Sequence, residues 1–133
     1  MKNLFFIVMP LILLLSSCSN DPKLENIEDV IDRGITSSVK QARFLADKVK
    51  SEQDKLPRSV DDEGKLVTSE SSWWTSGFFP GTLWYLYEIT GDTILRIDAE
   101  IYTKRVEKEQ FNKGNHDVGF MLYCSFGNGY RLT

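Results

Sequence analysis

Hydrophobic side chains recur every three or four residues over most of this chain, which is the period of an amphipathic helix. The pattern predicts helices over residues 25–50, 78–90 and 92–110, and a fourth that opens at residues 116–120. Polar side chains occupy the opposite faces; in the third helix the predicted solvated face comprises Lys104, Arg105, Lys108 and Glu109. The chain is therefore predicted to be all-α, organised as two helical hairpins.

The connections between these helices contain residues that usually end helices, cap them or form turns. Gly91 is predicted to end the second helix, because a left-handed glycine is a common helix stop, and Asp92 to cap the third. The fourth helix is predicted to end in a turn at residues 126–130. Residues 51–72 contain few apolar groups, with turn chemistry at residues 61–64. Since no segment alternates clearly as a strand does, residues 51–72 are predicted to form a long loop.

The first residues have the pattern of an export signal. Residues 4–15 form an apolar run behind Lys2, too short for a spanning helix of about 20 residues. Leu15-Ser16-Ser17-Cys18 resembles the bacterial lipobox, in which the cysteine thiol is lipidated. Residues 1–17 are therefore expected to be a lipoprotein signal peptide and 18–24 a tether. The alternative is an ordinary signal peptide followed by an incidental cysteine.

With Cys18 lipidated, the protein is expected to be an exported bacterial lipoprotein of the periplasm or outer membrane, held to the membrane by its acyl chains. Cys124 would then have no partner, so a disulfide framework is excluded, and a small buried hydrophobe is its expected role. A length of 133 residues indicates one domain, expected over residues 25–133. A net charge of −3 and no basic stripe make nucleic acid an unexpected partner.

Three side chains are candidates for chemistry. Trp74, with Trp73 before it, follows a polar loop beside Gly77, which favours an indole exposed enough to stack on a ligand over a purely core role. Asp117 precedes an apolar helix, where it could be an N-cap, a catalytic carboxylate or both. His116 could bond a substrate or serve the structure, and without a second histidine it does not suggest a metal site.

Four blocks occur in an order that resembles glycoside hydrolase family 88, the unsaturated glucuronyl hydrolases. They are WTSGFFPG at 74–81, LWYLYE at 83–88, HDVGF at 116–120 and SFGNGY at 125–130, and LPRS at 56–59 is also similar to the family. The resemblance implies an (α/α)6 barrel, of which residues 25–133 would supply about the first four of twelve helices. It implies no cofactor and no metal.

The resemblance also implies an activity. The family removes a C4=C5 unsaturated glucuronic acid from the non-reducing end of lyase-generated oligosaccharides of glycosaminoglycan type, by hydration of the double bond. Trp74 resembles the tryptophan that lies against the unsaturated sugar. Asp117 resembles one of two essential aspartates, and His116 its substrate-contacting neighbour. The second aspartate, the general acid and base, belongs to a later hairpin in the family.

Four helices cannot close a twelve-helix ring, so the 133 residues are expected to be the N-terminal third of an enzyme, inactive and aggregation-prone alone. Two other functions stay open from the sequence. One is an unsaturated rhamnogalacturonyl hydrolase, with the same barrel and chemistry but pectin fragments as substrate. The other is a non-catalytic lipoprotein remnant.

Overall fold

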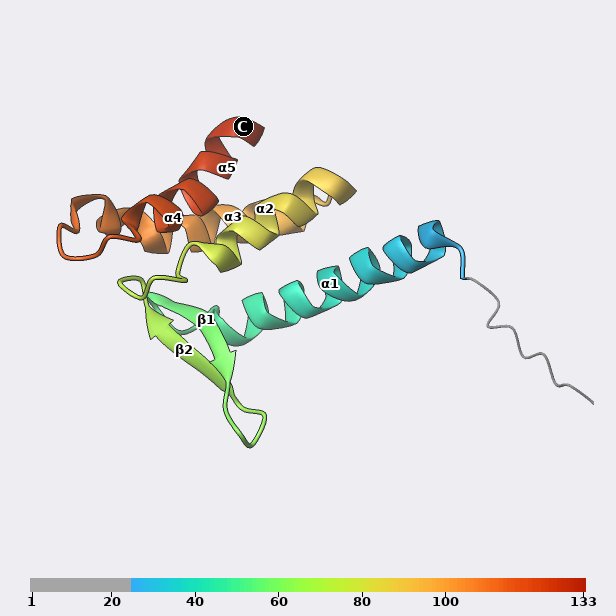
Figure 1. Cartoon of the computed structure of the whole chain (residues 1–133), viewed down its shortest axis with the longest axis horizontal. Helices are drawn as coiled ribbons and strands as arrows, with labels where there is room; N and C mark the ends of the chain where they lie inside the picture. Colours follow the sequence, from blue (N-terminus) through green and yellow to red (C-terminus); the bar gives the residue numbers. More distant parts are fainter. Residues whose placement is uncertain (1–24) are drawn as a thin grey trace, which may run out of the picture.

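A computed structural model describes residues 25–133, so the predicted signal peptide, tether and lipidated Cys18 lie outside the described residues. The described chain is mostly helical, as predicted, with one small sheet (Figure 1). Its main elements are α1 (Ile27–Val49), β1 (Lys55–Val60), β2 (Leu66–Glu70), α2 (Phe78–Thr90) and α3 (Thr93–Val106). They are followed by a 3-10 helix, η1 (Glu107–Phe111), then α4 (Val118–Leu122), a π-helical turn, η2 (Tyr123–Gly127), and α5 (Asn128–Leu132).

The loop predicted over residues 51–72 is wrong, because β1 and β2 pair there as an antiparallel hairpin. The predicted turn at its tip is correct: Gly64 has a φ of 78°, and the Asp61 carboxylate accepts the Lys65 backbone N–H at 2.8 Å. Pro57 within β1 and an irregular register hid the strands, since both interrupt the alternation by which a strand is recognised. The buried side chain of Leu56 anchors the hairpin in the core.

The turn predicted at residues 126–130 is also wrong, because the chain stays helical from α4 through η2 to α5. Two glycines in this segment suggested the turn. Gly129 instead provides room for the Trp84 indole: a Cβ at Gly129 would lie 3.1 Å from the nearest ring carbon. The Trp84 ring N–H donates to the Thr103 hydroxyl of α3 at 2.9 Å. Gly129 thus serves close helix packing.

The helices α2 and α3 lie side by side as an antiparallel pair, visible in Figure 1. Gly91 ends α2 in the left-handed conformation and Asp92 caps α3 by accepting the Ile94 N–H at 3.0 Å, so both predicted signals are confirmed. Arg43 of α1 forms an ion pair with the same Asp92 carboxylate. Buried side chains between the two helices form the centre of the core, among them Leu83, Trp84, Leu95, Ala99 and Tyr102.

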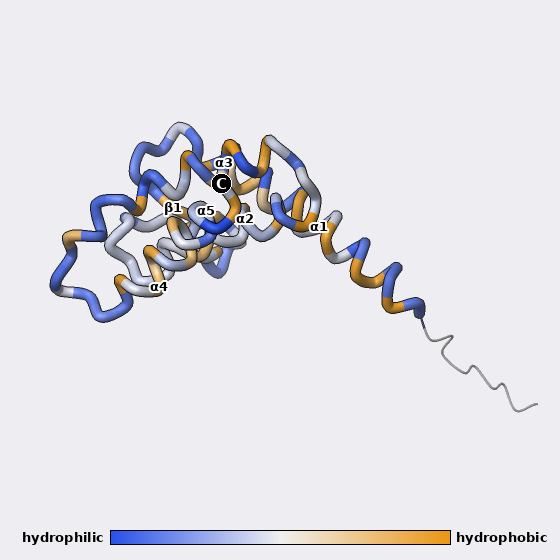
Figure 2. The backbone as a smooth tube through the Cα atoms, turned by 90° about the horizontal axis from the view of Figure 1, so that it is seen from above, coloured by the Kyte–Doolittle hydropathy of each residue, from blue (hydrophilic) through white to orange (hydrophobic). Residues whose placement is uncertain are grey.

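Only the second half of α1 packs on this pair. Ala42, Ala46 and Val49 are buried, and the Tyr102 hydroxyl of α3 donates to the Ala46 carbonyl. Toward its N-terminus the helix extends beyond the other elements with hydrophobic positions still on its surface, as Figure 2 shows in orange. Among them, Ile27 and Ile31 are exposed.

The end of α1 is held by Arg105 of α3. Its Nη1 donates to three carbonyls, those of Val49 at 3.1 Å, Glu52 at 3.0 Å and Lys55 at 2.7 Å. Its Nη2 donates to the Lys50 carbonyl at 3.1 Å, and the guanidinium lies 4.4 Å from the ring centre of Tyr102. Helix ends leave such carbonyls without partners, so one side chain satisfies the end of α1 and fixes the first residue of β1.

Replacing Arg105 by alanine is expected to lower the free energy of unfolding by about 2–4 kcal/mol, because several carbonyls lose a charged donor at once. Arg105→Lys is expected to lose less, since an ammonium retains the charge without the planar fork. Urea denaturation of the complete protein measures both. The matched control is Arg96→Ala in the same helix, whose solvent-exposed pair with Glu100 is expected to contribute little to stability. Equal midpoints for Arg105→Ala and Arg96→Ala would contradict the role of Arg105.

Candidate active site

Two loops converge at one end of the molecule: residues 71–77, called here the Trp loop, and residues 112–117, the His-Asp loop. The start of α2 lies directly against α4 and η2, backbone to backbone. A Cβ at Gly77 would lie 2.2 Å from the Met121 carbonyl oxygen, and a Cβ at Gly81 would lie 2.8 Å from that of Cys124. Only glycine permits this approach, which brings the residues after Trp74 beside the residues after Asp117.

Hydrogen bonds join the two loops. The buried carboxylate of Glu109, 4% exposed, accepts from the Ser71 hydroxyl at 2.5 Å and from the Asn112 side-chain amide at 2.8 Å. The Asn115 amide donates to the Ser72 carbonyl at 3.2 Å, while its Oδ1 accepts the Asp117 backbone N–H at 2.9 Å. The spacing of the two loops is therefore fixed by polar contacts as well as by packing.

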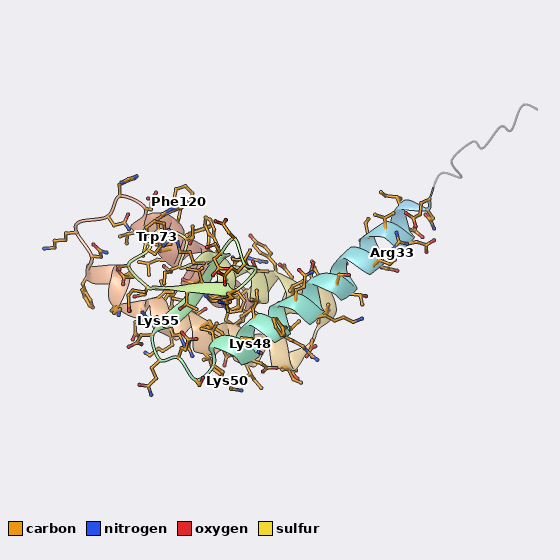
Figure 3. The ribbon with its side chains drawn as sticks, turned by 90° about the horizontal axis from the view of Figure 1, so that it is seen from below. Arg33, Lys48, Lys50, Lys55, Trp73 and Phe120 are labelled. Atoms are coloured by element: carbon orange, nitrogen blue, oxygen red, sulfur yellow. The ribbon has the colours of Figure 1, made fainter. Side chains whose placement is uncertain are left out.

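Both tryptophans of the Trp loop remain partly accessible. Trp74 is 44% exposed and meets Phe78 edge-on, with ring centres 5.7 Å apart. Trp73 is 37% exposed. Figure 3 shows Trp73 and Phe120 at the same end of the molecule, away from Arg33. Neither indole is a core residue, so the predicted exposure is correct, while the stacking role of Trp74 stays a prediction.

Asp117 lies at the start of α4, yet its carboxylate makes no capping hydrogen bond. The backbone, with φ −88° and ψ 4°, lacks the extended conformation that N-cap residues usually adopt. The carboxylate is 22% exposed, and its contact within residues 25–133 is His116 Nε2 at 3.4 Å from Oδ2. The N-cap interpretation is therefore wrong, and the carboxylate retains its acceptor capacity for a ligand.

His116 projects outward, with its side chain 95% exposed. It lines a groove of about 400 Å3 together with Gly119, Phe120, Tyr123 and Cys124. Burial raises the pKa of the half-buried Cys124 thiol, which disfavours the nucleophilic thiolate and agrees with a packing role. The structure thus brings His116 and Asp117 together by direct contact, and joins them to Trp74 through the backbones of the two loops.

Two residues that hold the loops together, Glu109 and Asn115, were not among the site residues predicted from the sequence. Asn115 carried a readable signal, since an asparagine in a loop often forms an Asx turn by bonding the backbone two residues on. Glu109 carried none: it was placed on the solvated face of the third helix, whereas the structure buries it.

Within residues 25–133, no three side chains of the His, Cys, Asp and Glu types gather as metal ligands would. In the same range, none of the helices combines the length and apolar character needed to cross a membrane.

No family model matches the chain. The chain is 44% identical over 77 residues to an unsaturated glucuronyl hydrolase of Formosa agariphila, covering 57% of this chain and 19% of that protein. It is 36% identical over 75 residues to an unsaturated glucuronyl hydrolase of a Bacillus species, covering 54% and 20%. A solved structure of an unsaturated glucuronyl hydrolase specific for heparin matches 80% of this chain and 28% of its own, with 40% identity and a TM-score of 0.74.

The helical architecture and these similarities define a glycosidase-type helical barrel, of which the described residues form a part. The chain belongs to the unsaturated glucuronyl hydrolases of glycoside hydrolase family 88, as its sequence blocks predicted. The chain spans about a fifth of the length of the curated relatives it matches.

Glu109→Ala is expected to loosen both loops, because Ser71 and Asn112 lose their shared acceptor. The cost is expected to be about 1–3 kcal/mol of unfolding free energy, with faster amide hydrogen exchange at residues 71–77 and 112–117. Hydrogen exchange read by mass spectrometry on the complete protein measures the effect. Glu107→Ala is the matched control, since that side chain pairs with Lys104 at the surface. Unchanged exchange in Glu109→Ala would show that packing alone holds the loops.

Proposed function

We propose that the protein containing this chain removes a C4=C5 unsaturated glucuronic acid from the non-reducing end of lyase-generated oligosaccharides of glycosaminoglycan type, by hydrating the double bond. Family membership and the heparin-specific relative support the class of substrate. One observation carries the proposal. A half-exposed indole and a carboxylate that makes no helix-capping bond lie on two loops that a hydrogen bond joins. A sugar site needs both an apolar platform and a polar anchor.

Trp74 is proposed as the platform. One pyranose face presents mainly C–H groups, and an exposed indole offers a large rigid surface for it at little cost in side-chain entropy. Its edge-on contact with Phe78 holds the ring in place, at the start of α2. Proximity of this kind lets a site orient the double bond before any proton moves.

Asp117 and His116 are proposed as the polar side of the site. In the proposed reaction a proton adds to C4, the oxygen of water adds to C5, and the resulting hemiketal opens to release the neighbouring sugar. Asp117 is proposed to accept hydrogen bonds from sugar hydroxyls and so to support the acid that delivers the proton. In the family pattern that acid is a second aspartate on a later helical hairpin. His116, 3.4 Å from Asp117, is proposed as a further substrate contact.

Asp117→Asn in the complete protein is expected to lower turnover of unsaturated glycosaminoglycan disaccharides by about 10²–10⁴-fold, because the amide cannot replace a charged acceptor. Loss of the ultraviolet absorbance of the double bond measures turnover. Asp62→Asn, at the exposed tip of the hairpin, is the matched control and is expected to keep wild-type rates.

A wild-type rate in Asp117→Asn would contradict the assigned role. Turnover by the wild-type protein of pectin-derived disaccharides alone would favour an unsaturated rhamnogalacturonyl hydrolase. If Trp74→Ala bound the oligosaccharide as well as the wild-type protein does, the proposed stacking role of Trp74 would be contradicted. A non-catalytic remnant would then be favoured.

The lipid anchor on Cys18 is also proposed, supported by the Leu-Ser-Ser-Cys sequence at the end of an apolar run. Cys18→Ser in a bacterial host is expected to abolish incorporation of labelled fatty acid and to move the protein from the membrane to the soluble fraction. Cys124→Ser is the matched control and is expected to leave both readings unchanged. Fatty-acid labelling that survives Cys18→Ser would exclude this residue as the anchor point.

A further inference from the structure

Arg58 of the hairpin occupies an irregular position in β1. Pro57 pairs with Thr68 and Ser59 pairs with Val67, so two partners that are adjacent on β2 face residues two apart on β1. Arg58 is the extra residue of a β-bulge. Bulges break the alternation of side chains and redirect one of them, and they are frequent beside functional sites.

The redirected side chain lies over the Trp loop. The guanidinium carbon of Arg58 is 3.8 Å from the ring centre of Trp73, a close cation–π contact. Such stacking uses the flat face of the guanidinium and leaves its N–H donors, which point outward in the plane, free for other partners. Arg58 is itself exposed.

Those donors have no acceptor within residues 25–133, where Arg58 forms neither an ion pair nor a hydrogen bond. The other arginines of this range all have polar partners. Arg33, Arg43, Arg96 and Arg131 each pair with a carboxylate, and Arg105 donates to backbone carbonyls. Arg58 is thus held in place by an aromatic ring, with its hydrogen-bonding capacity unused.

The position of Arg58 relates it to the proposed sugar site. Trp73, on which it stacks, immediately precedes Trp74. The backbone fixes this part of the Trp loop, since the Trp73 N–H donates to the Glu70 carbonyl at 3.1 Å and the Trp73 carbonyl accepts from Ser76 N–H at 2.9 Å. A cation therefore lies on the face of the indole that immediately precedes, in the chain, the indole proposed to carry the sugar.

We infer that Arg58 is a specificity-determining residue that binds an oxyanion of the oligosaccharide, a uronate carboxylate or a sulfate ester, beside the sugar that stacks on Trp74. A planar guanidinium binds either group through two parallel hydrogen bonds, and prior stacking on Trp73 limits the entropy lost on binding. The inference rests on the proposed function, because it concerns the same substrate.

The test compares Arg58→Met with Arg58→Lys in the complete protein. Methionine retains an apolar stem over Trp73 and removes the charge, whereas lysine retains the charge and removes the fork. On unsaturated disaccharides, Arg58→Met is expected to lower kcat/KM by about 10- to 100-fold, mainly through KM, with Arg58→Lys in between. Lys65→Gln, which removes a positive charge at the hairpin tip, is the matched control and is expected to stay within about twofold of wild type.

Two further readings separate binding from packing. The KM of wild type is expected to rise with salt, and that of Arg58→Met to rise less, because the screened charge pair is gone. Disaccharides with and without sulfate identify the oxyanion: a loss confined to sulfated substrates assigns the sulfate, and an equal loss on both assigns the carboxylate. A merely structural contact would shift neither reading.

Wild-type KM and salt dependence in both variants, with melting temperatures showing that they are folded, would overturn the anion site and leave the proposed function intact. If Arg58→Met does not fold, Arg58→Lys decides by the same criterion. Absence of turnover and of binding by the wild-type protein, measured first, would instead overturn the proposed function and the anion site with it.

Discussion

Arg105 brings one guanidinium to the point where the end of α1, the start of β1 and the body of α3 meet. The carbonyls that it satisfies belong to segments about 50 residues earlier in the chain, and no other side chain described here bonds all of them. Without this contact α1 would be held by the Arg43–Asp92 ion pair, the Tyr102–Ala46 hydrogen bond and small side chains such as Ala42, which bury little apolar area each. Lys55, the first residue of the hairpin, would then no longer be bonded to α3.

From that point the site is assembled through a series of rigid contacts. The helix that carries Arg105 continues into η1, where Glu109 holds Ser71, so one continuous helical segment fixes both the start of the hairpin and its exit. The Trp loop follows that exit directly, and Asn115 attaches the His-Asp loop to it. Placing binding residues on loops that a rigid scaffold holds is how helical folds combine variable chemistry with precise geometry.

Local signals predicted well what depends on local structure. The helices, the left-handed Gly91 and the Asp92 cap are properties of short windows, and the structure confirms them. The hairpin escaped prediction because Pro57 and the bulge at Arg58 remove the alternation that identifies a strand. Arg105 and Glu109 were assigned to a solvated face because the carbonyls that Arg105 bonds and the Ser71 hydroxyl that bonds Glu109 lie 38 to 56 residues away, which no periodicity reveals. Ordered sequence blocks pointed to Trp74, His116 and Asp117, whereas the contacts that position them required the fold.

Within residues 25–133, Asp117 and Arg58 each lack polar partners that their positions or residue type usually have, and they carry opposite charges, which bears on the proposed binding of an anionic sugar. Asp117 makes none of the capping bonds that its position offers, and Arg58 has no carboxylate partner within residues 25–133, where four other arginines each have one. Sequences usually break such local preferences where function requires it. A uronate approaching Asp117 meets a charge of its own sign, which would oppose binding by Asp117 alone. In the proposed complex, the cation of Arg58, which β1 holds on the face of Trp73, offsets that repulsion and orients the sugar, so that the carboxylate of Asp117 is compatible with an anionic substrate.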